Sequence, residues 1–217
     1  MLSRGEFLAG WSALHGGYDP GSSRVVRTWL ALAYRLAVPL ARMRVAPDAL
    51  TYAGLLPPLV ALAAAGAGGP WLLFAAAAVA LTGVLDALDG AVAVLSRRTS
   101  SWGAVLDSVV DRCGDALFLV TLFVAGAPGW ACVLAGVLTF LLEYARARAG
   151  CAGMREVGVV TAWERPARVV VVAMFLVAAG LLPSYGEPFL AVGCAVAVVL
   201  GVVAIGQLLI VVRRALT

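Results

Sequence analysis

The chain has 217 residues, of which 63% are hydrophobic and 13% charged, and its net charge at neutral pH is +4. A water-soluble domain would be about half apolar and about a quarter charged, so the composition excludes an ordinary soluble protein. It predicts a polytopic membrane protein of the all-α fold class, with membrane lipids as partners and no nucleic acid.

The N-terminal part of the chain differs from the rest. The first 21 residues lack the charged start and apolar run of a secretory signal peptide. Residues 22–44 then mix five arginines with apolar residues, Trp29 and Tyr34, which predicts an amphipathic helix in the membrane interface. A solvated helix packed on the protein's own cytoplasmic side is the alternative. We therefore separate a cytoplasmic N-terminal segment, residues 1–44, from a transmembrane catalytic domain, residues 45–217.

Six apolar stretches follow, each close to the roughly 20 residues that a membrane-spanning helix needs. Clusters of glycine and proline separate several of them. The predicted transmembrane helices are Ala49–Gly66, Pro70–Leu95, Gly103–Gly126, Trp130–Ala147, Arg165–Leu182 and Pro188–Val212.

Arginine placement predicts the orientation of these helices. The turn after the second stretch, the connection between the fourth and fifth stretches with its bordering ends, and the C-terminus all carry arginine, whereas the three other turns carry none. Positive charge is enriched in cytoplasmic loops. Both termini and the two basic loops are therefore expected on the cytoplasmic side of a bacterial-type inner membrane.

Four aspartates lie near that side, in two pairs: Asp86 with Asp89, and Asp107 with Asp111. Spacings of three and four residues place each pair on one helix face, and the two helices are neighbours in the chain. Packed carboxylates repel unless a multivalent cation neutralises them, and charge inside a membrane protein usually serves ions or substrates. Hard oxygen ligands suit Mg²⁺, Mn²⁺ or Ca²⁺, so we predict a two-metal site. Solvation at helix ends is the alternative.

The four cysteines are Cys113, Cys132, Cys151 and Cys194. They show no CxxC spacing, which argues against a metal site. A free cysteine in an apolar segment behaves as a small hydrophobic side chain. We therefore predict buried thiols at these positions rather than metal ligands or disulfides.

The aspartates belong to a longer pattern: Asp86-x2-Asp89-Gly90-x2-Ala93, followed by Gly103-x3-Asp107-x3-Asp111. This pattern resembles the signature of the CDP-alcohol phosphatidyltransferases. Within that family, the chain most resembles the bacterial phosphatidylinositol-phosphate synthases and members like the phosphatidylglycerophosphate synthases. The resemblance covers nearly the whole chain, since six spans and an interfacial helix are also typical of the family. It implies a homodimeric enzyme of phospholipid biosynthesis that joins a CDP-linked lipid, commonly CDP-diacylglycerol, to a polar alcohol and releases CMP.

The resemblance also implies roles for individual residues. The four aspartates would hold two Mg²⁺ or Mn²⁺ ions that bind the diphosphate, and Asp111 would also take the proton from the attacking hydroxyl. Gly90 would let the nucleotide approach the backbone, although a lone glycine also favours helix packing. The other predicted CDP-lipid contacts are Asp48, Thr51, Ser100, Arg97 and Arg98.

Two further arginines are candidates for the acceptor site. The segments Glu143–Gly150 and Glu164–Arg168 resemble parts of phosphatidylinositol-phosphate synthases in which basic residues hold the acceptor's phosphate. The resemblance carries this role to Arg146 and Arg168, which implies a phosphorylated acceptor such as inositol phosphate or glycerol phosphate. Arginine suits phosphate because its planar fork gives two parallel hydrogen bonds. Ordinary loop arginines that satisfy the positive-inside rule are the alternative.

The chain departs from the family pattern at two positions. Val94 stands where most members place an arginine that would contact the CDP-lipid phosphates, and Leu208 stands where related synthases often have arginine. Arg97 and Arg98 lie about one helical turn beyond Val94 and are predicted to reach the same phosphates. Two functions therefore stay open: an active transferase, or a non-catalytic or altered-specificity relative that keeps the divalent-metal cluster.

Overall fold

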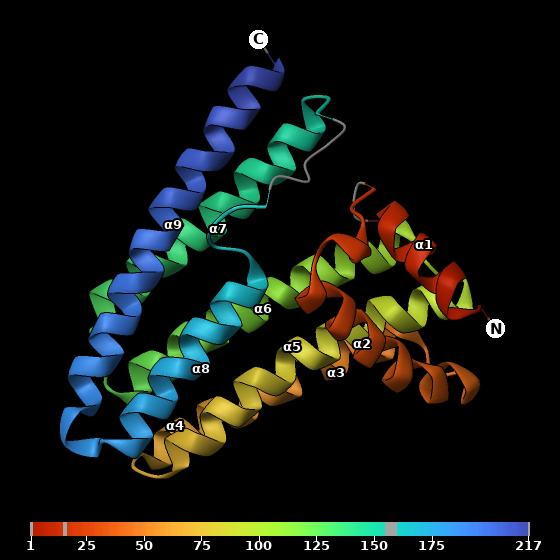
Figure 1. Ribbon diagram of the computed structural model, residues 1–217. Helices are drawn as coiled ribbons and strands as arrows, with labels where there is room; N and C mark the ends of the chain where they lie inside the picture. The colour runs from red at the N-terminus through yellow and green to blue at the C-terminus, as the bar shows by residue number, and fades with distance from the viewer. Residues whose placement is uncertain (1, 15–16, 155–159, 217) are drawn as a thin grey trace. The chain divides into compact units, whose positions relative to one another are not determined.

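The computed structural model describes residues 2–14, 17–154 and 160–216, and these residues form an all-helical structure (Figure 1). This confirms the predicted fold class for the described part of the chain. The α-helices in chain order are α1 (Arg4–Leu14), α2 (Arg24–Arg42), α3 (Pro47–Ala53), α4 (Leu56–Ala67), α5 (Trp71–Ser96), α6 (Ser101–Ala125), α7 (Gly129–Cys151), α8 (Arg165–Leu181) and α9 (Gly186–Leu216). Two short 3-10 helices, η1 (Pro20–Ser22) and η2 (Pro183–Tyr185), complete the structure.

The chain folds into two compact units. The first comprises Met1–Leu56 and Thr82–Asp111, and the second comprises Pro57–Leu81 and Arg112–Thr217. Helices α5 and α6 therefore each contribute residues to both units. The division between residues 44 and 45 stays a prediction, as does the assignment of a catalytic domain to residues 45–217.

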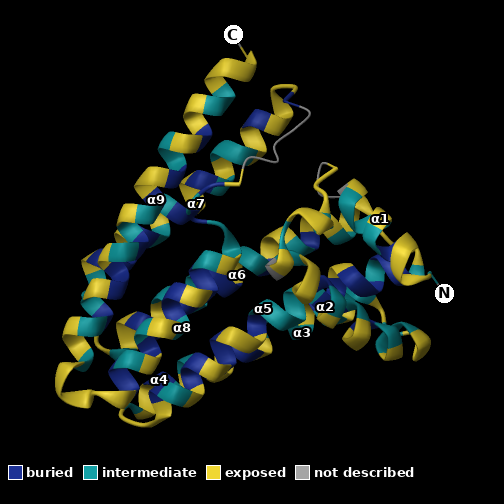
Figure 2. Ribbon diagram, in the orientation of Figure 1, coloured by how far each residue is buried: buried dark blue, intermediate teal, exposed yellow. Residues whose placement is uncertain are grey.

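The core of the first unit forms where α1 and α2 pack with the second half of α5. Helix α2 buries Leu30, Ala33 and Ala37, which recur at helical spacing along one face. Phe7 of α1 is fully buried in the same cluster, and its ring centroid lies 5.4 Å from that of Tyr34. The buried stripe of α2 and its exposed opposite face can be followed in Figure 2.

Helix α1 was not among the predicted elements, yet its start carries a capping box. The backbone N–H of Ser3 donates to the carboxylate of Glu6 at 2.7 Å, and the backbone N–H of Glu6 donates to the Ser3 hydroxyl at 3.3 Å. This reciprocal pair satisfies two N–H groups at the helix start. Further along α1, Gly10 faces α5: a Cβ at Gly10 would lie 3.0 Å from Val94.

In the second unit, α7 and α9 lie side by side, and α8 packs against α9 (Figure 1). Their shared core contains Ala135 and Leu142 of α7 together with Ala197, Ala204 and Leu208 of α9. Small residues on both helices allow the backbones to approach closely, as is common between helices in membranes. Leu208 is completely buried in this cluster, so it is a core residue of α9.

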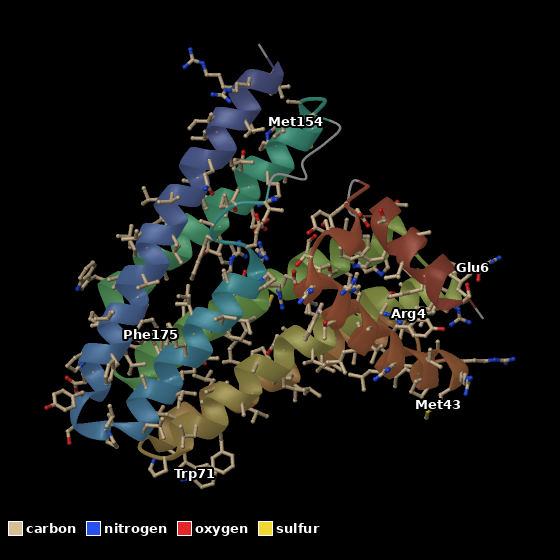
Figure 3. The ribbon with its side chains drawn as sticks, viewed as in Figure 1. Arg4, Glu6, Met43, Trp71, Met154 and Phe175 are labelled. Atoms are coloured by element: carbon tan, nitrogen blue, oxygen red, sulfur yellow. The ribbon has the colours of Figure 1, made fainter. Side chains whose placement is uncertain are left out.

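A glycine on α9 is required by the packing of α8. A Cβ at Gly193 would lie 2.7 Å from Cγ and 3.0 Å from Cβ of Phe175, whose position on α8 is labelled in Figure 3. Rotation of the ring about the Cβ–Cγ bond moves neither atom, and rotation about the Cα–Cβ bond leaves the 3.0 Å contact with Cβ in place. We expect Gly193→Ala to destabilise the protein by about 1–3 kcal/mol, measured as a lower thermal unfolding midpoint in detergent.

Gly206→Ala is the matched control on the same helix. No atom lies within 4 Å of a Cβ at Gly206, so the added methyl group should stabilise the helix by about 0.5–1 kcal/mol. Equal unfolding midpoints for the two variants would show that Phe175 does not restrict position 193.

Four helical segments are long and apolar enough to cross a membrane: Pro47–Ala67, Trp71–Ser96, Gly129–Cys151 and Pro183–Leu216. Within the described part of the chain, these four segments support a membrane protein. Helix α8 has 17 residues, which is short for a span, and α6 carries Asp107, Asp111, Arg112 and Asp115 along its length. The predicted total of six spans therefore stays a prediction.

Candidate active site

Three of the predicted metal ligands come together in the first unit. Asp86 projects from α5, and Asp107 and Asp111 project from successive turns of α6. Each offers a carboxylate oxygen, and these oxygens lie within 4.8 Å of one another. All three residues are half-buried. Carboxylates this close repel when ionised, and a divalent cation with a preference for oxygen ligands would neutralise them.

Asp89 lies outside this group of three but belongs to the same unit. It is buried, with 7% of its surface exposed. Its Oδ2 atom accepts a hydrogen bond from the Thr51 hydroxyl at 2.7 Å, and its Oδ1 atom accepts one from the backbone N–H of Gly90. Asp86 lies three residues before Asp89 on the same helix, so its carboxylate would repel that of Asp89 when both are ionised. A positive ion bound among the carboxylates would offset this repulsion as well.

The predicted nucleotide contacts have definite places in the first unit. The Thr51 hydroxyl is buried and bonded to Asp89. The Ser100 hydroxyl caps α6, since it accepts from the backbone N–H of Gly103 at 2.9 Å. Asp48 belongs to the same neighbourhood, because its Oδ1 atom would lie 3.8 Å from a Cβ at Gly103. These polar groups therefore gather where α3 meets the start of α6.

Gly90 presents an open backbone on α5. No protein atom lies within 4 Å of a Cβ placed there, and the residue is exposed. Packing among the described residues therefore gives no reason for a glycine at this position. A ligand that approaches the helix backbone would give one.

The position that departs from the family pattern is part of the core. Val94 has 7% of its surface exposed and packs in the cluster formed by α1, α2 and α5. Helix α5 ends at Ser96, and Arg97 adopts a left-handed backbone conformation with φ of 54°. The helix therefore stops before the two arginines instead of continuing through them. Arg97 and Arg98 are both exposed at the start of the turn to α6.

The predicted acceptor arginines belong to the second unit, where they join a network of ion pairs. Arg168 of α8 is 2% exposed. Its guanidinium donates to Asp115 at 2.8 Å, to Glu143 at 2.6 Å and to the backbone oxygen of Trp163 at 3.0 Å. Three helices, α6, α7 and α8, thus meet at one buried arginine.

Arg146 has a more exposed place in the same network. Its NH2 atom donates to Glu164 at 2.6 Å, and its Nε atom lies 3.6 Å from Glu143. One-fifth of its side-chain surface is exposed. Glu164 also accepts bonds from the backbone and the hydroxyl of Thr161, which fixes the segment that enters α8.

Sequence reasoning missed four members of this network: Arg112, Asp115, Glu143 and Glu164. Arg112 lies 3.1 Å from Asp115 and 3.0 Å from Glu143. Spacing along single helices could have indicated two of these residues. Asp115 continues the four-residue spacing of Asp107 and Asp111, and Glu143 precedes Arg146 by three residues. The pairing between helices could not be read from those spacings.

The cysteines correct one prediction. Cys132 and Cys194 are buried as expected, whereas Cys113 and Cys151 are exposed. Cys113 follows Arg112 on α6 but faces away from the core, and Cys151 is the last residue of α7. The apolar residues next to each cysteine in the sequence do not indicate whether its side chain lies on the buried or on the exposed face of the helix.

Several described helices are long and apolar enough to cross a membrane, and three carboxylates form a cluster suited to a divalent metal. The chain is therefore a helical membrane protein with a candidate metal centre. The CDP-alcohol phosphatidyltransferase family matches residues 44–211. The chain belongs to this family and is therefore an enzyme of the phospholipid-synthesising transferases, as the motif predicted.

Similar proteins support this assignment over most of the chain. The phosphatidylinositol phosphate synthase of Cutibacterium acnes is 32% identical over 203 residues, which cover 86% of this chain and 95% of that protein. The archaetidylinositol phosphate synthase of Methanothermobacter thermautotrophicus is 32% identical over 154 residues, 68% of this chain and 71% of that protein.

Two crystal structures of Mycobacterium tuberculosis phosphatidylinositol phosphate synthase share the fold, each at 27% identity. The structure with CDP-DAG bound has a TM-score of 0.70 and covers 85% of this chain and 95% of that chain. The complex with manganese and citrate has a TM-score of 0.71 and covers 84% and 90%.

Proposed function

We propose that the protein transfers a phosphatidyl group from CDP-diacylglycerol to the hydroxyl of a phosphorylated polar alcohol and releases CMP. Inositol phosphate is the first candidate acceptor and glycerol phosphate the second. The observation that carries the proposal is the convergence of Asp86, Asp107 and Asp111 within 4.8 Å in a chain of this family. Relatives named as phosphatidylinositol phosphate synthases support the choice of acceptor.

The proposed ligands of the metal centre are Asp86, Asp89, Asp107 and Asp111, with Mg²⁺ or Mn²⁺ as the ion. When bound, two such ions supply positive charge to the diphosphate and to the leaving CMP. Asp111 takes the proton from the acceptor hydroxyl as its oxygen bonds to phosphorus. The phosphorus–oxygen bond to CMP then breaks. Thr51 holds the Asp89 carboxylate in place throughout.

The proposed binding surface for the CDP-lipid comprises Asp48, Thr51, Gly90, Ser100, Arg97 and Arg98. Gly90 supports it with an open backbone, and the two exposed arginines supply the positive charge that Val94 does not. For the acceptor's phosphate we propose Arg146, which is partly exposed. Arg168 stays the second proposed acceptor contact; it also donates three bonds inside the protein that link α6, α7 and α8.

We also propose six membrane spans, cytoplasmic termini and active site, and a homodimer. The distribution of arginine supports the orientation. Helix α2 is proposed to lie in the membrane interface, because Trp29, Leu32 and Leu36 are exposed on a helix that also carries four arginines. The homodimer follows from the family resemblance.

A non-catalytic or altered-specificity relative is the second candidate, and the burial of Val94 favours it. A valine in the core contributes no positive charge to a bound diphosphate. The two candidates differ in CMP release by the purified protein supplied with CDP-diacylglycerol and Mg²⁺ or Mn²⁺. The transferase proposal expects release that depends on inositol phosphate or glycerol phosphate and stops when the metal is chelated. No turnover with these acceptors, or with inositol and serine, would favour the second candidate.

Thr51→Val is expected to weaken divalent-metal binding about 10- to 100-fold, as is typical when a residue that orients a metal ligand is lost. The valine keeps the shape of the side chain but removes the bond to the buried carboxylate of Asp89. Titration of Mn²⁺ into the protein measures the effect. Thr51→Ser keeps the hydroxyl and should bind nearly as wild type, so equal losses in both variants would contradict this role.

Gly90→Ala is expected to raise the KM for CDP-diacylglycerol about tenfold, equivalent to about 1.4 kcal/mol, without lowering stability. The methyl group meets no protein atom and should favour the helix by about 0.5–1 kcal/mol. Gly206→Ala provides the control for the stabilising effect. Unchanged KM in Gly90→Ala would show that the nucleotide does not approach this backbone.

A further inference from the structure

Two of the four cysteines meet inside the second unit. The Sγ atoms of Cys132 on α7 and Cys194 on α9 lie 3.6 Å apart, although the residues are 62 positions apart in the chain. Both side chains are buried, with 6% and 0% of their surfaces exposed. The sulfur atoms are therefore held in direct contact between the two helices that form the core of this unit.

The two sulfur atoms are in contact but not bonded. A disulfide bond is about 2.0 Å long, so the two sulfur atoms would have to approach by roughly 1.6 Å between them. Rotation about the Cα–Cβ bond moves Sγ without moving the backbone. Helices α7 and α9 pack through small residues such as Ala135, Ala197 and Ala204, which lets their backbones approach closely.

A groove between α6 and α7 borders one of these two cysteines. It has a volume of about 560 Å³, and Cys132 is one of its lining residues. The rest of the lining is apolar or glycine, including Leu119, Phe123, Gly136 and Val137. A small uncharged oxidant can enter such a groove, whereas a charged one is excluded by the cost of desolvation.

We infer that Cys132 and Cys194 are a reversible modification site, at which hydrogen peroxide converts the thiol pair to a disulfide that joins α7 to α9. The sulfur of Cys132 attacks the peroxide, its S–H and the O–O bond break, and a sulfenic acid and one water form. The thiol of Cys194 then attacks that sulfur, and the second water leaves as the S–S bond forms. Two thiols are oxidised, and one hydrogen peroxide is reduced to two waters.

This site differs from the two other cysteines in its dependence on the fold. Cys113 and Cys151 are exposed, so they react with oxidants or alkylating agents directly. Cys132 and Cys194 are brought together by the packing of α7 on α9, so the bridge between them should form faster in the folded protein than in the unfolded chain. Replacing Cys113 and Cys151 by serine therefore isolates the pair.

The test uses the full chain with Cys113→Ser and Cys151→Ser, purified in detergent and exposed to hydrogen peroxide. The protein is then denatured, alkylated and weighed by intact mass spectrometry. We expect a monomer that has lost the mass of two hydrogen atoms and accepts no alkyl group. Digestion should yield a peptide pair linked through Cys132 and Cys194, and dithiothreitol should restore two alkylatable thiols.

Further variants in the same background show whether the pair itself is responsible. Adding Cys132→Ser or Cys194→Ser should abolish the internal bridge, and unfolding the parent before peroxide is added should slow its formation severalfold. Two alkylatable thiols after peroxide treatment of the folded protein would overturn the inference. So would a sulfinic acid on Cys132 beside an intact Cys194 thiol, or a bridge formed only between two chains.

Discussion

Replacing Asp111 by asparagine is expected to reduce CMP release about a thousandfold, within the range by which a positioned acid or base accelerates a reaction. Asparagine keeps the size of the side chain but neither carries the negative charge nor takes a proton from the acceptor. The same change removes one of the three carboxylates that lie within 4.8 Å of one another. The measurement is the initial rate of CMP release with saturating CDP-diacylglycerol and acceptor.

Asp19→Asn is the matched control. Asp19 caps η1 by accepting from the backbone N–H of Gly21, and asparagine is an equally good cap. This variant should therefore fold normally and release CMP within about twofold of wild type. Comparable activity in Asp111→Asn and Asp19→Asn would contradict the catalytic role of Asp111.

Arg168→Ala is expected to destabilise the protein by about 3–5 kcal/mol, the typical cost of removing one partner from a buried ion pair. The change deletes the bonds to Asp115 and Glu143 and leaves two acidic groups with less positive charge around them. Thermal unfolding in detergent measures the loss. Arg168→Lys should fall between wild type and alanine, because lysine keeps the charge but not the planar fork.

Arg214→Ala is the control for the loss of an arginine side chain without the loss of a buried ion pair. Arg214 is exposed in the last turn of α9, and a surface substitution of this kind usually changes stability by less than about 0.5 kcal/mol. If Arg168→Ala unfolds at the same temperature as Arg214→Ala but loses acceptor binding, Arg168 is a ligand contact rather than the centre of a structural network.

The positions of the long helices could be predicted because the length of each apolar stretch can be read from the sequence. The predicted helix Pro70–Leu95 corresponds to α5, Trp71–Ser96, within one residue at each end. Helix α1 was not predicted, because its glycines and the lack of a long apolar run argued against a helix more strongly than the Ser3–Glu6 capping box argued for one. The first predicted span is interrupted at Gly54 and Leu55, between α3 and α4, a local break that hydropathy does not reveal.

The candidate site could be predicted only as far as spacing along single helices reaches. The pairs of aspartates follow from intervals of three and four residues. The bond between Thr51 and Asp89 joins residues 38 positions apart, and that between Arg168 and Asp115 joins residues 53 apart. Such contacts depend on how helices pack, so an arginine predicted to bind phosphate could equally be paired inside the protein.

The acidic side chains on α5 and α6 repel one another and become a binding site once a divalent ion sits among them. Anomalous diffraction from crystals of the wild-type protein soaked in Mn²⁺ tests it most directly. We expect a manganese peak bonded to Asp86, Asp107 and Asp111, and its loss in Asp107→Asn crystals. Density without such a peak, or manganese bound only elsewhere, would show that these carboxylates do not form a divalent-ion site.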